Sequence, residues 1–187
     1  GEAGNTRLGV YYGLPADDIA RTGSEDGELI VFDRAVALHD SVWNEVHRVT
    51  DKMVFRYPTE KQVADGAFIP GVMPVDLAPG DYWMSLQIRD RLSGKSQVYK
   101  QPITLGNYAS RDTLQVSDVE LAFHVSESDD AEGEFVKRGL KVIPMSSKSF
   151  QRDQNAFVYF EIYNLQRDEF GQTHYKVEYT VRSFTER

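Results

Sequence analysis

The chain has 187 residues, a formal net charge of -8 and no cysteine, while 41% of its residues are hydrophobic and 12% are aromatic. An acidic surface repels phosphate groups, and no apolar run approaches the roughly 20 residues that span a bilayer, so we expect neither nucleic-acid binding nor direct membrane insertion. Without cysteine there are no disulfides, thiol nucleophiles or thiolate metal sites, but the apolar content suffices for a packed interior.

The first 105 residues contain short strand-like runs separated by turns, a pattern typical of a β-sandwich. We expect strands at residues 8–12, 28–32, 36–39, 42–48, 52–57 and 68–77. Single helical turns are predicted at 16–21 and 59–64, and no segment has the length and periodicity of a long amphipathic helix.

The clearest strand begins at residue 82, where apolar and polar residues alternate. The apolar positions are Tyr82, Met84, Leu86 and Ile88. Trp83 falls on the opposite, largely polar face. The turn at residues 90–94, with Gly94 where a positive φ is expected, leads into a second strand at 96–100 and predicts a hairpin.

In the second half of the chain the sequence predicts four more strands, at residues 114–124, 139–143, 157–165 and 175–183. The last two are joined by a turn at 168–171 and form a predicted hairpin. The strand at 175–183 is expected to be half-buried because Tyr175, Val177, Tyr179 and Val181 alternate with polar residues. In the strand before it, Val158, Phe160 and Ile162 are expected to face the core.

Small and polar residues around position 106 interrupt the strand pattern and indicate a boundary. We therefore predict an all-β fold with two immunoglobulin-like β-sandwich-type units in series, at residues 1–106 and 113–187, joined by a linker at 107–112. The second unit has only four or five strands, so it either leans on the first unit or needs sequence beyond Arg187.

Five segments, taken in order, carry a resemblance to a known family: 10–15, 79–95, 114–122, 139–144 and 157–165. The most distinctive stretches are Ser-Asp-Val-Glu-Leu-Ala at 117–122 and Tyr-Phe-Glu-Ile-Tyr-Asn-Leu at 159–165. Together they resemble the β-rich region of bacterial GWxTD-domain-containing proteins. The naming signature is absent, so the resemblance implies the region downstream of it. It implies an exported protein in the periplasm or at the cell surface, and it carries over no catalytic residue or ligand.

Metal sites are not predicted. The histidines at positions 39, 47, 124 and 174 are scattered rather than closely spaced. The acidic loop at residues 126–134 imitates the first ligand positions of an EF-hand, but position twelve of such a loop is Gly139, and no helices flank it. We interpret this loop as a mobile, solvated connector.

A catalytic site is not predicted either, and no cofactor is expected. Ser117, Asp118 and His124 are close in sequence, but strand alternation separates Ser117 from the other two. The chain has no nucleophile elbow and no glycine-rich loop feeding a helix. A hydrolase with an unrecognised site ranks third among the functions considered.

The remaining candidates are aromatic residues on polar strand faces: Trp83, Trp43, Tyr159 and Tyr163. Exposed aromatics anchor protein partners or stack against sugar rings. We expect a binding or assembly module with a protein partner, and a carbohydrate-binding module is the alternative. The structural alternative is that Trp83 packs under a loop or against the second unit.

Overall fold

The computed structural model describes residues 4–24, 27–57, 68–108 and 113–182, and these residues are organised almost entirely as strands and loops. The first part contains β1 (Thr6–Pro15), β2 (Thr22–Ser24), β3 (Gly27–His39), β4 (Glu45–Tyr57), β5 (Phe68–Leu77), β6 (Gly80–Asp90) and β7 (Ser96–Leu105). The second part contains β8 (Gln115–Val116), β9 (Glu120–Glu127), β10 (Val136–Lys137), β11 (Leu140–Pro144), β12 (Phe157–Tyr159) and β13 (Ile162–Tyr163). One short 3-10 helix, η1 (Ala16–Asp18), follows β1. The predicted all-β class is confirmed.

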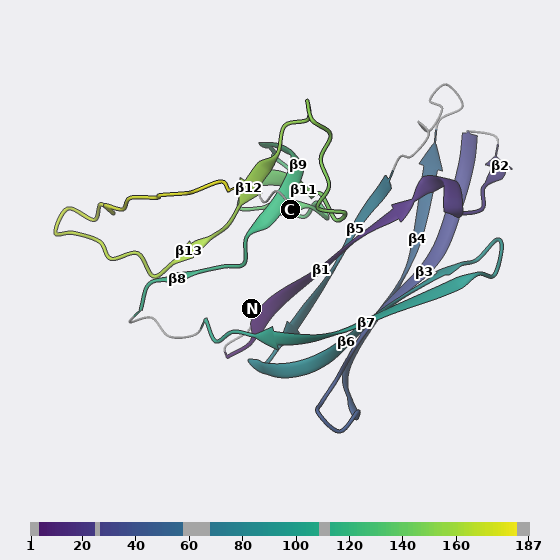
Figure 1. The fold of residues 1–187 in the computed structure, drawn as a ribbon, viewed down its shortest axis with the longest axis horizontal. Coiled ribbons are helices and arrows are strands. Elements are labelled where there is room, and N and C mark those ends of the chain that lie inside the picture. The colour runs from purple at the N-terminus through teal and green to yellow at the C-terminus, as the bar shows by residue number, and fades with distance from the viewer. Residues whose placement is uncertain (1–3, 25–26, 58–67, 109–112, 183–187) are drawn as a thin grey trace, which may run out of the picture.

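In the first part, two sheets enclose the main core, as in a β-sandwich (Figure 1). The larger sheet places β3 between β4 and β6, and β7 follows β6, while the short β2 pairs with the start of β3. The smaller sheet is the antiparallel pair of β1 and β5. Ile30, Phe32, Val36 and Leu38 of β3 are completely buried between the two sheets. The core is therefore centred on β3.

Strand β6 follows the predicted alternation. Tyr82, Met84, Leu86 and Ile88 belong to the core cluster or pack against it. The side chains of Trp83, Gln87 and Arg89 point to the opposite face and are exposed. We call the face of the large sheet that turns away from the core its outer face.

Several predicted boundaries in this part are wrong. Strand β3 runs without a break through the two segments predicted at 28–32 and 36–39, because Asp33, Arg34 and Ala35 continue its pairing with β4 and β6. Strand β4 likewise continues through the gap predicted between 42–48 and 52–57. Strand β4 starts at Glu45, and Val42 lies in the turn that precedes it. The helical turn predicted at 59–64 lies outside the described residues, as do residues 109–112 of the predicted linker.

The second part is built from two small sheets, with strand orders β10-β11-β9-β12 and β13-β8. Ala122 and Val142 are completely buried in it. The strands predicted at 114–124 and 157–165 are each divided between these sheets. Between the two sheets, where both segments pass from one sheet to the other, the amide of Ser117 donates to the Glu161 carbonyl at 2.9 Å, and the Glu161 amide donates to Ser117 Oγ at 2.8 Å. The face prediction fails at Val158, which is 58% exposed because β12 presents only its other face to the sheet interior.

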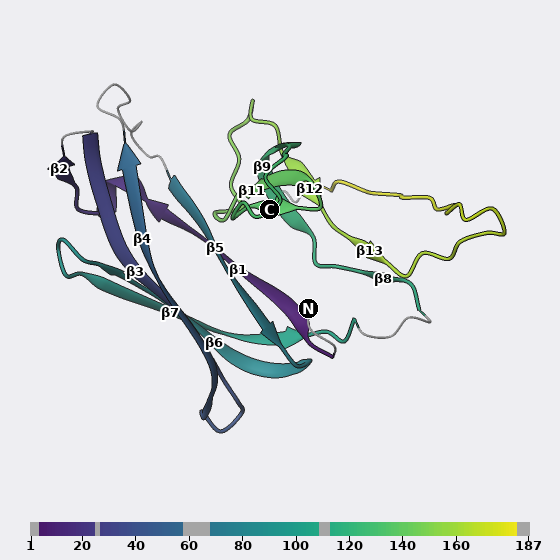
Figure 2. The ribbon, with the colours of Figure 1, turned by 180° about the vertical axis from the view of Figure 1, so that it is seen from behind.

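The strand predicted at 175–183 is wrong for its described residues. Residues 164–182 form no ladder, and Tyr175, Val177, Tyr179 and Val181 are between 47% and 90% exposed. The turn before them does form, with the Asp168 amide donating to the Gln172 carbonyl at 2.8 Å. Figures 1 and 2 show this segment looping away from the strands. We call residues 166–182 the C-terminal arm.

Candidate functional site

Four side chains gather at one end of the outer face, where β3 turns into β4. The Trp43 and Trp83 rings are stacked, with centroids 5.1 Å apart and an angle of 19° between their planes. The His39 ring lies 5.8 Å from Trp43, and Lys100 Nζ lies 5.4 Å from the centre of the Trp43 ring. We call Trp43, Trp83, His39 and Lys100 the aromatic cluster.

Strand pairing explains how residues so distant in sequence meet. His39 of β3 pairs directly with Trp83 of β6, so their side chains share the outer face. Lys100 of β7 pairs with Ser85, the next residue of β6 on that face. The turn after His39 then folds Trp43 back over Trp83. The cluster thus requires two strand pairings, β3 with β6 and β6 with β7, and one turn.

The turn that carries Trp43 is fixed by Asp40. Its Oδ1 accepts hydrogen bonds from the amides of Val42 and Asn44, each at 2.9 Å, and its Oδ2 accepts one from Asn44 Nδ2 at 2.9 Å. These bonds, the side-chain bond from Asn44 first, lower the pKa of Asp40. Trp43 has a φ of 67°, in the left-handed region that bulky residues rarely adopt. Such strain concentrates at functional sites, where the surrounding structure holds the residue in place.

The cluster is accessible to a partner. Trp43 is 51% exposed and Trp83 is 36% exposed, and the neighbouring Val42 and Val46 are exposed as well. Trp83 is covered on one face by Trp43, which belongs to the turn between β3 and β4. The end of the sheet therefore presents large apolar side chains on a fixed backbone.

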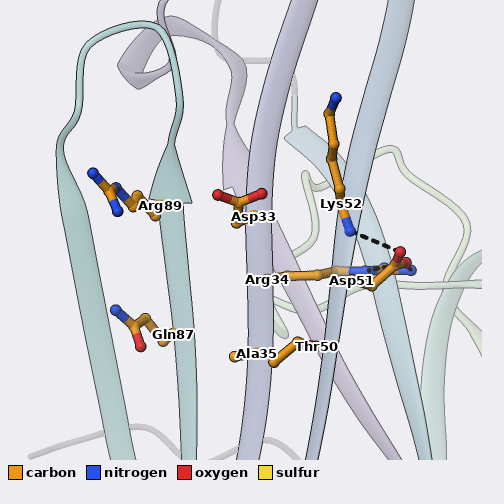
Figure 3. A pocket seen from close by; sticks show the side chains of 8 residues that line it. All are labelled: Asp33, Arg34, Ala35, Thr50, Asp51, Lys52, Gln87 and Arg89. Carbon is orange, nitrogen blue, oxygen red and sulfur yellow. Dashed lines mark hydrogen bonds and ion pairs between the residues drawn. The ribbon is translucent and has the colours of Figure 1, made fainter.

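The middle of the outer face has a different character. A shallow depression there is lined by side chains of β3, β4 and β6, shown in Figure 3. Arg89, Asp33 and Lys52 form a row across three strands, in which the central carboxylate alternates with two cations. The next row contains the small Ala35 between Gln87 and Thr50, which makes the hollow. Opposite charges on neighbouring strands stabilise the sheet.

Tyr159 and Tyr163 lie elsewhere, on β12 and β13, and the structure does not bring them to the tryptophans (Figure 1). Tyr159 donates a hydrogen bond to Glu161 Oε1 at 2.8 Å, and Arg138 Nε donates to Glu161 Oε2 at 3.2 Å. Tyr163 meets the ring of Tyr108 edge to face at 5.5 Å. Both tyrosines are half-buried and engaged in contacts within the chain.

Electrostatics around Glu161 agree with this structural role. Burial opposes ionisation of Glu161, but the hydrogen bonds from Tyr159 and Arg138 outweigh it and lower the pKa of the carboxyl. Burial and the neighbouring Glu161 raise the pKa of Tyr163 to about 12 and also raise the pKa of Tyr159. Both phenols stay protonated at neutral pH, so neither is an activated base.

A buried arginine that the sequence analysis missed joins the two parts of the chain. Arg34 Nη1 donates to Tyr12 Oη at 2.8 Å and to Glu134 Oε1 at 2.8 Å, and Arg34 Nη2 donates to Asp51 Oδ2 at 2.8 Å. Burial by itself would lower the pKa of Arg34, but the bonds to Glu134, Tyr12 and Asp51 raise it. A signal was present, since Arg34 occupies the inner-face position between Phe32 and Val36.

Glu134 ends the acidic loop, so this end of the predicted connector is anchored on the first part. Nearby, Lys137 is ion-paired with Glu120 and lies 4.8 Å from the centre of the Tyr11 ring of β1. The second part thus contacts β1 and β5 through charged side chains.

The other candidates acquire no common site. Ser117 Oγ donates to the Asp118 carbonyl and accepts from the Glu161 amide, so this hydroxyl holds together the two segments that connect the small sheets. His39 lies beside Trp43, while His174 contacts Asp168 in the arm. Within the described ranges, no three histidine, aspartate or glutamate residues come together as a metal-binding group.

No protein-family model matches the chain, and no curated protein matches it. In the described part of the chain, no helix is long and apolar enough to cross a membrane.

Proposed function

We propose that this chain is a non-catalytic recognition module that binds a partner protein through the aromatic cluster. The observation that carries the proposal is the stacked and exposed pair of Trp43 and Trp83 on a strained, hydrogen-bonded turn. Tryptophan is enriched among the residues that dominate binding energy at protein interfaces. A side chain already fixed before binding loses less conformational entropy in the complex, which favours affinity.

The arrangement of the rings favours a protein over a sugar. A sugar ring stacks on an open aromatic face, but Trp43 and Trp83 cover each other's facing surfaces, and Lys100 lies over the Trp43 ring. The stacked tryptophans are exposed and apolar, as are Val42 and Val46, which lie close to Trp43 in sequence, and Lys100 adds a cation beside the Trp43 ring. Patches of this kind mark protein interaction sites.

The experiment compares partner capture by three immobilised proteins: the natural chain, Trp43→Ala and Phe170→Ala. Phe170 is an exposed aromatic residue of the C-terminal arm and serves as the matched control. A partner purified from the cells that make the chain should bind about 30-fold more weakly to Trp43→Ala, the loss expected for a dominant interface residue, and equally well to Phe170→Ala. Equal binding to all three proteins would contradict the proposal. Quenching of tryptophan emission by a polysaccharide, lost in Trp43→Ala, would replace it with the carbohydrate function.

The resemblance to the β-rich region of GWxTD-domain-containing proteins supplies the proposed setting, an exported bacterial protein outside the cytoplasm. Fractionation of the producing cells, followed by detection of the chain with an antibody, tests this location. Recovery in the periplasmic or surface fraction supports it, and recovery in the cytoplasm contradicts it.

A further inference from the structure

A strand at the edge of a sheet presents unpaired backbone N–H and C=O groups to which another strand can bind. Strand β1 is such an edge. It pairs with β5 on one side, and no described strand pairs with its other side.

The register shows which residues offer their backbone groups at this edge. Tyr11 pairs with Val72, and the Val72 amide donates to Glu134 Oε1 at 3.4 Å, so it points away from β1. In an antiparallel pair both residues then turn their N–H and C=O groups outward. Because this direction alternates along a strand, the free edge of β1 is formed by Arg7, Gly9, Tyr11 and Gly13.

The free edges of β5 and β7 are blunted by proline. The same alternation places the nitrogen atoms of Pro70 and Pro74 on the free edge of β5, and proline has no N–H to donate. In the β6–β7 pair, the amide of Asp90 donates to the carbonyl of Lys95, and hydrogen-bonded residue pairs alternate from there along the ladder. This alternation places the nitrogen atom of Pro102 on the free edge of β7, away from β6. From Arg7 to Gly13, β1 contains no proline, and Arg7 is its only charged residue.

Beside this edge the core is incompletely covered. The inner-face residues of β3 are completely buried, but Leu86 and Ile88 of β6 are only half-buried, and Tyr99 of β7 is 60% exposed. Thr6 Oγ1 donates to the carbonyl of Gly106, the residue that follows β7, so the start of β1 lies beside the end of β7. A strand added to β1 would therefore cover apolar side chains with one of its faces.

The described residues include a segment suited to that place. Residues 173–182 have the length of β1, alternate apolar and polar side chains, and form no ladder in their own molecule. Tyr175, Val177, Tyr179 and Val181 supply one apolar face. The other face carries Lys176, Glu178 and Arg182, a local charge of +1 (two cations and one anion) in a chain of net charge -8. This sign favours contact with the rest of another copy.

We propose that residues 173–182 of a second copy of this chain add a strand to the free edge of β1. Backbone pairing with Arg7, Gly9, Tyr11 and Gly13 supplies the affinity. The apolar face of the donated strand packs over Leu86, Ile88 and Tyr99. The donor and acceptor surfaces differ, so the contact closes into a dimer by reciprocal exchange or continues as a chain of molecules.

The test is the molar mass of the purified chain at increasing concentration, measured by light scattering after size exclusion. The mass should rise above the 21.3 kDa of one copy. Tyr179→Lys, which places a charge in the apolar face of the donor, and Gly9→Pro, which removes an outward N–H from the acceptor, should each remain a monomer. Phe170→Lys, a change on the same arm outside the alternating face, should associate like the natural chain.

A mixture of Tyr179→Lys and Gly9→Pro provides the sharper result. The first variant keeps an intact acceptor and the second keeps an intact donor, so together they should form a heterodimer that neither forms alone. Tyr179 is exposed and its replacement does not disturb the core, so the test holds even where Gly9→Pro fails to fold. A monomer at every concentration, or unchanged association of Tyr179→Lys, overturns the proposal. Trp43→Ala should self-associate normally, so this proposal and the proposed function fail separately.

Discussion

Gly71 of β5 is a position where the packing admits no side chain. A Cβ atom added there would lie 2.2 Å from the Tyr12 ring, whose hydroxyl accepts a hydrogen bond from Arg34. Gly71→Ala should therefore displace Tyr12 and lower the free energy of unfolding by about 1–3 kcal/mol, as overpacking does. Chemical denaturation measures the loss. Gly23→Ala is the matched control, since nothing lies within 4 Å of its added Cβ, and equal stability of the two variants would contradict the described packing.

Asp90 is a buried carboxylate at the end of β6 whose charge contributes to stability. Burial opposes its ionisation, but bonds from the Ser93 hydroxyl at 2.6 Å and the Ala20 amide at 2.9 Å outweigh it and lower its pKa. A carboxyl with a lowered pKa in the folded state stabilises the fold fully above its unfolded pKa of about 3.9, and this stability is lost as the pH falls further.

In Asp90→Asn the free energy of unfolding should accordingly depend less steeply on pH below about pH 4 than it does in the natural chain. Thermal unfolding measured across the acid range provides the comparison, with the exposed Asp118→Asn as the control. A slope in Asp90→Asn as steep as that of the natural chain would show that this carboxyl does not supply the acid sensitivity.

At the scale of elements, Glu134 links the loop before β10 to β3 and β5. Glu134→Gln removes the charge opposite Arg34, so the free energy of unfolding should fall by about 1.5 kcal/mol, the lower end for a charged hydrogen bond. Hydrogen exchange at Val72 should also become faster, because its amide donates to Glu134. Glu132→Gln, an exposed change in the same loop, should leave both quantities unchanged. Unaltered exchange at Val72 in Glu134→Gln would mean that the loop does not hold β5.

Prediction of the strands from the sequence succeeded where the sequence signal is local. The alternation in β6 identifies its inner face because side-chain direction depends only on neighbouring residues. It failed for residues 175–182, where the same alternation is present but none of the described residues forms a partner strand. A strand forms only when its backbone hydrogen-bonds to a partner strand, in addition to having alternating side chains. The partner strand is supplied by residues distant in the sequence. The break between β12 and β13 likewise follows from the bonds of Glu161 to Ser117, which no local pattern reveals.

For the whole molecule, the all-β class followed from the spacing of strands and turns, while the meeting of distant side chains did not. Trp43 and Trp83 were both identified as candidates, but their stacking depends on the pairing of β3 with β6 and on the Asp40 turn. Tyr159 and Tyr163 were grouped with them because alternation predicts which face of a strand a side chain occupies, but not where that strand lies in the molecule. The structure places these tyrosines in the second part of the chain.

The proposed function depends most on the geometry of the tryptophan pair, and the chain contains just these two tryptophans. Stacked indole rings couple their electronic transitions, so far-ultraviolet circular dichroism of the natural chain should show an exciton couplet. The couplet should vanish in both Trp43→Phe and Trp83→Phe, and acrylamide should quench the emission of the natural chain because the rings are partly exposed. A spectrum without a couplet, or one that either replacement leaves unchanged, would show that the two rings do not form the proposed binding surface.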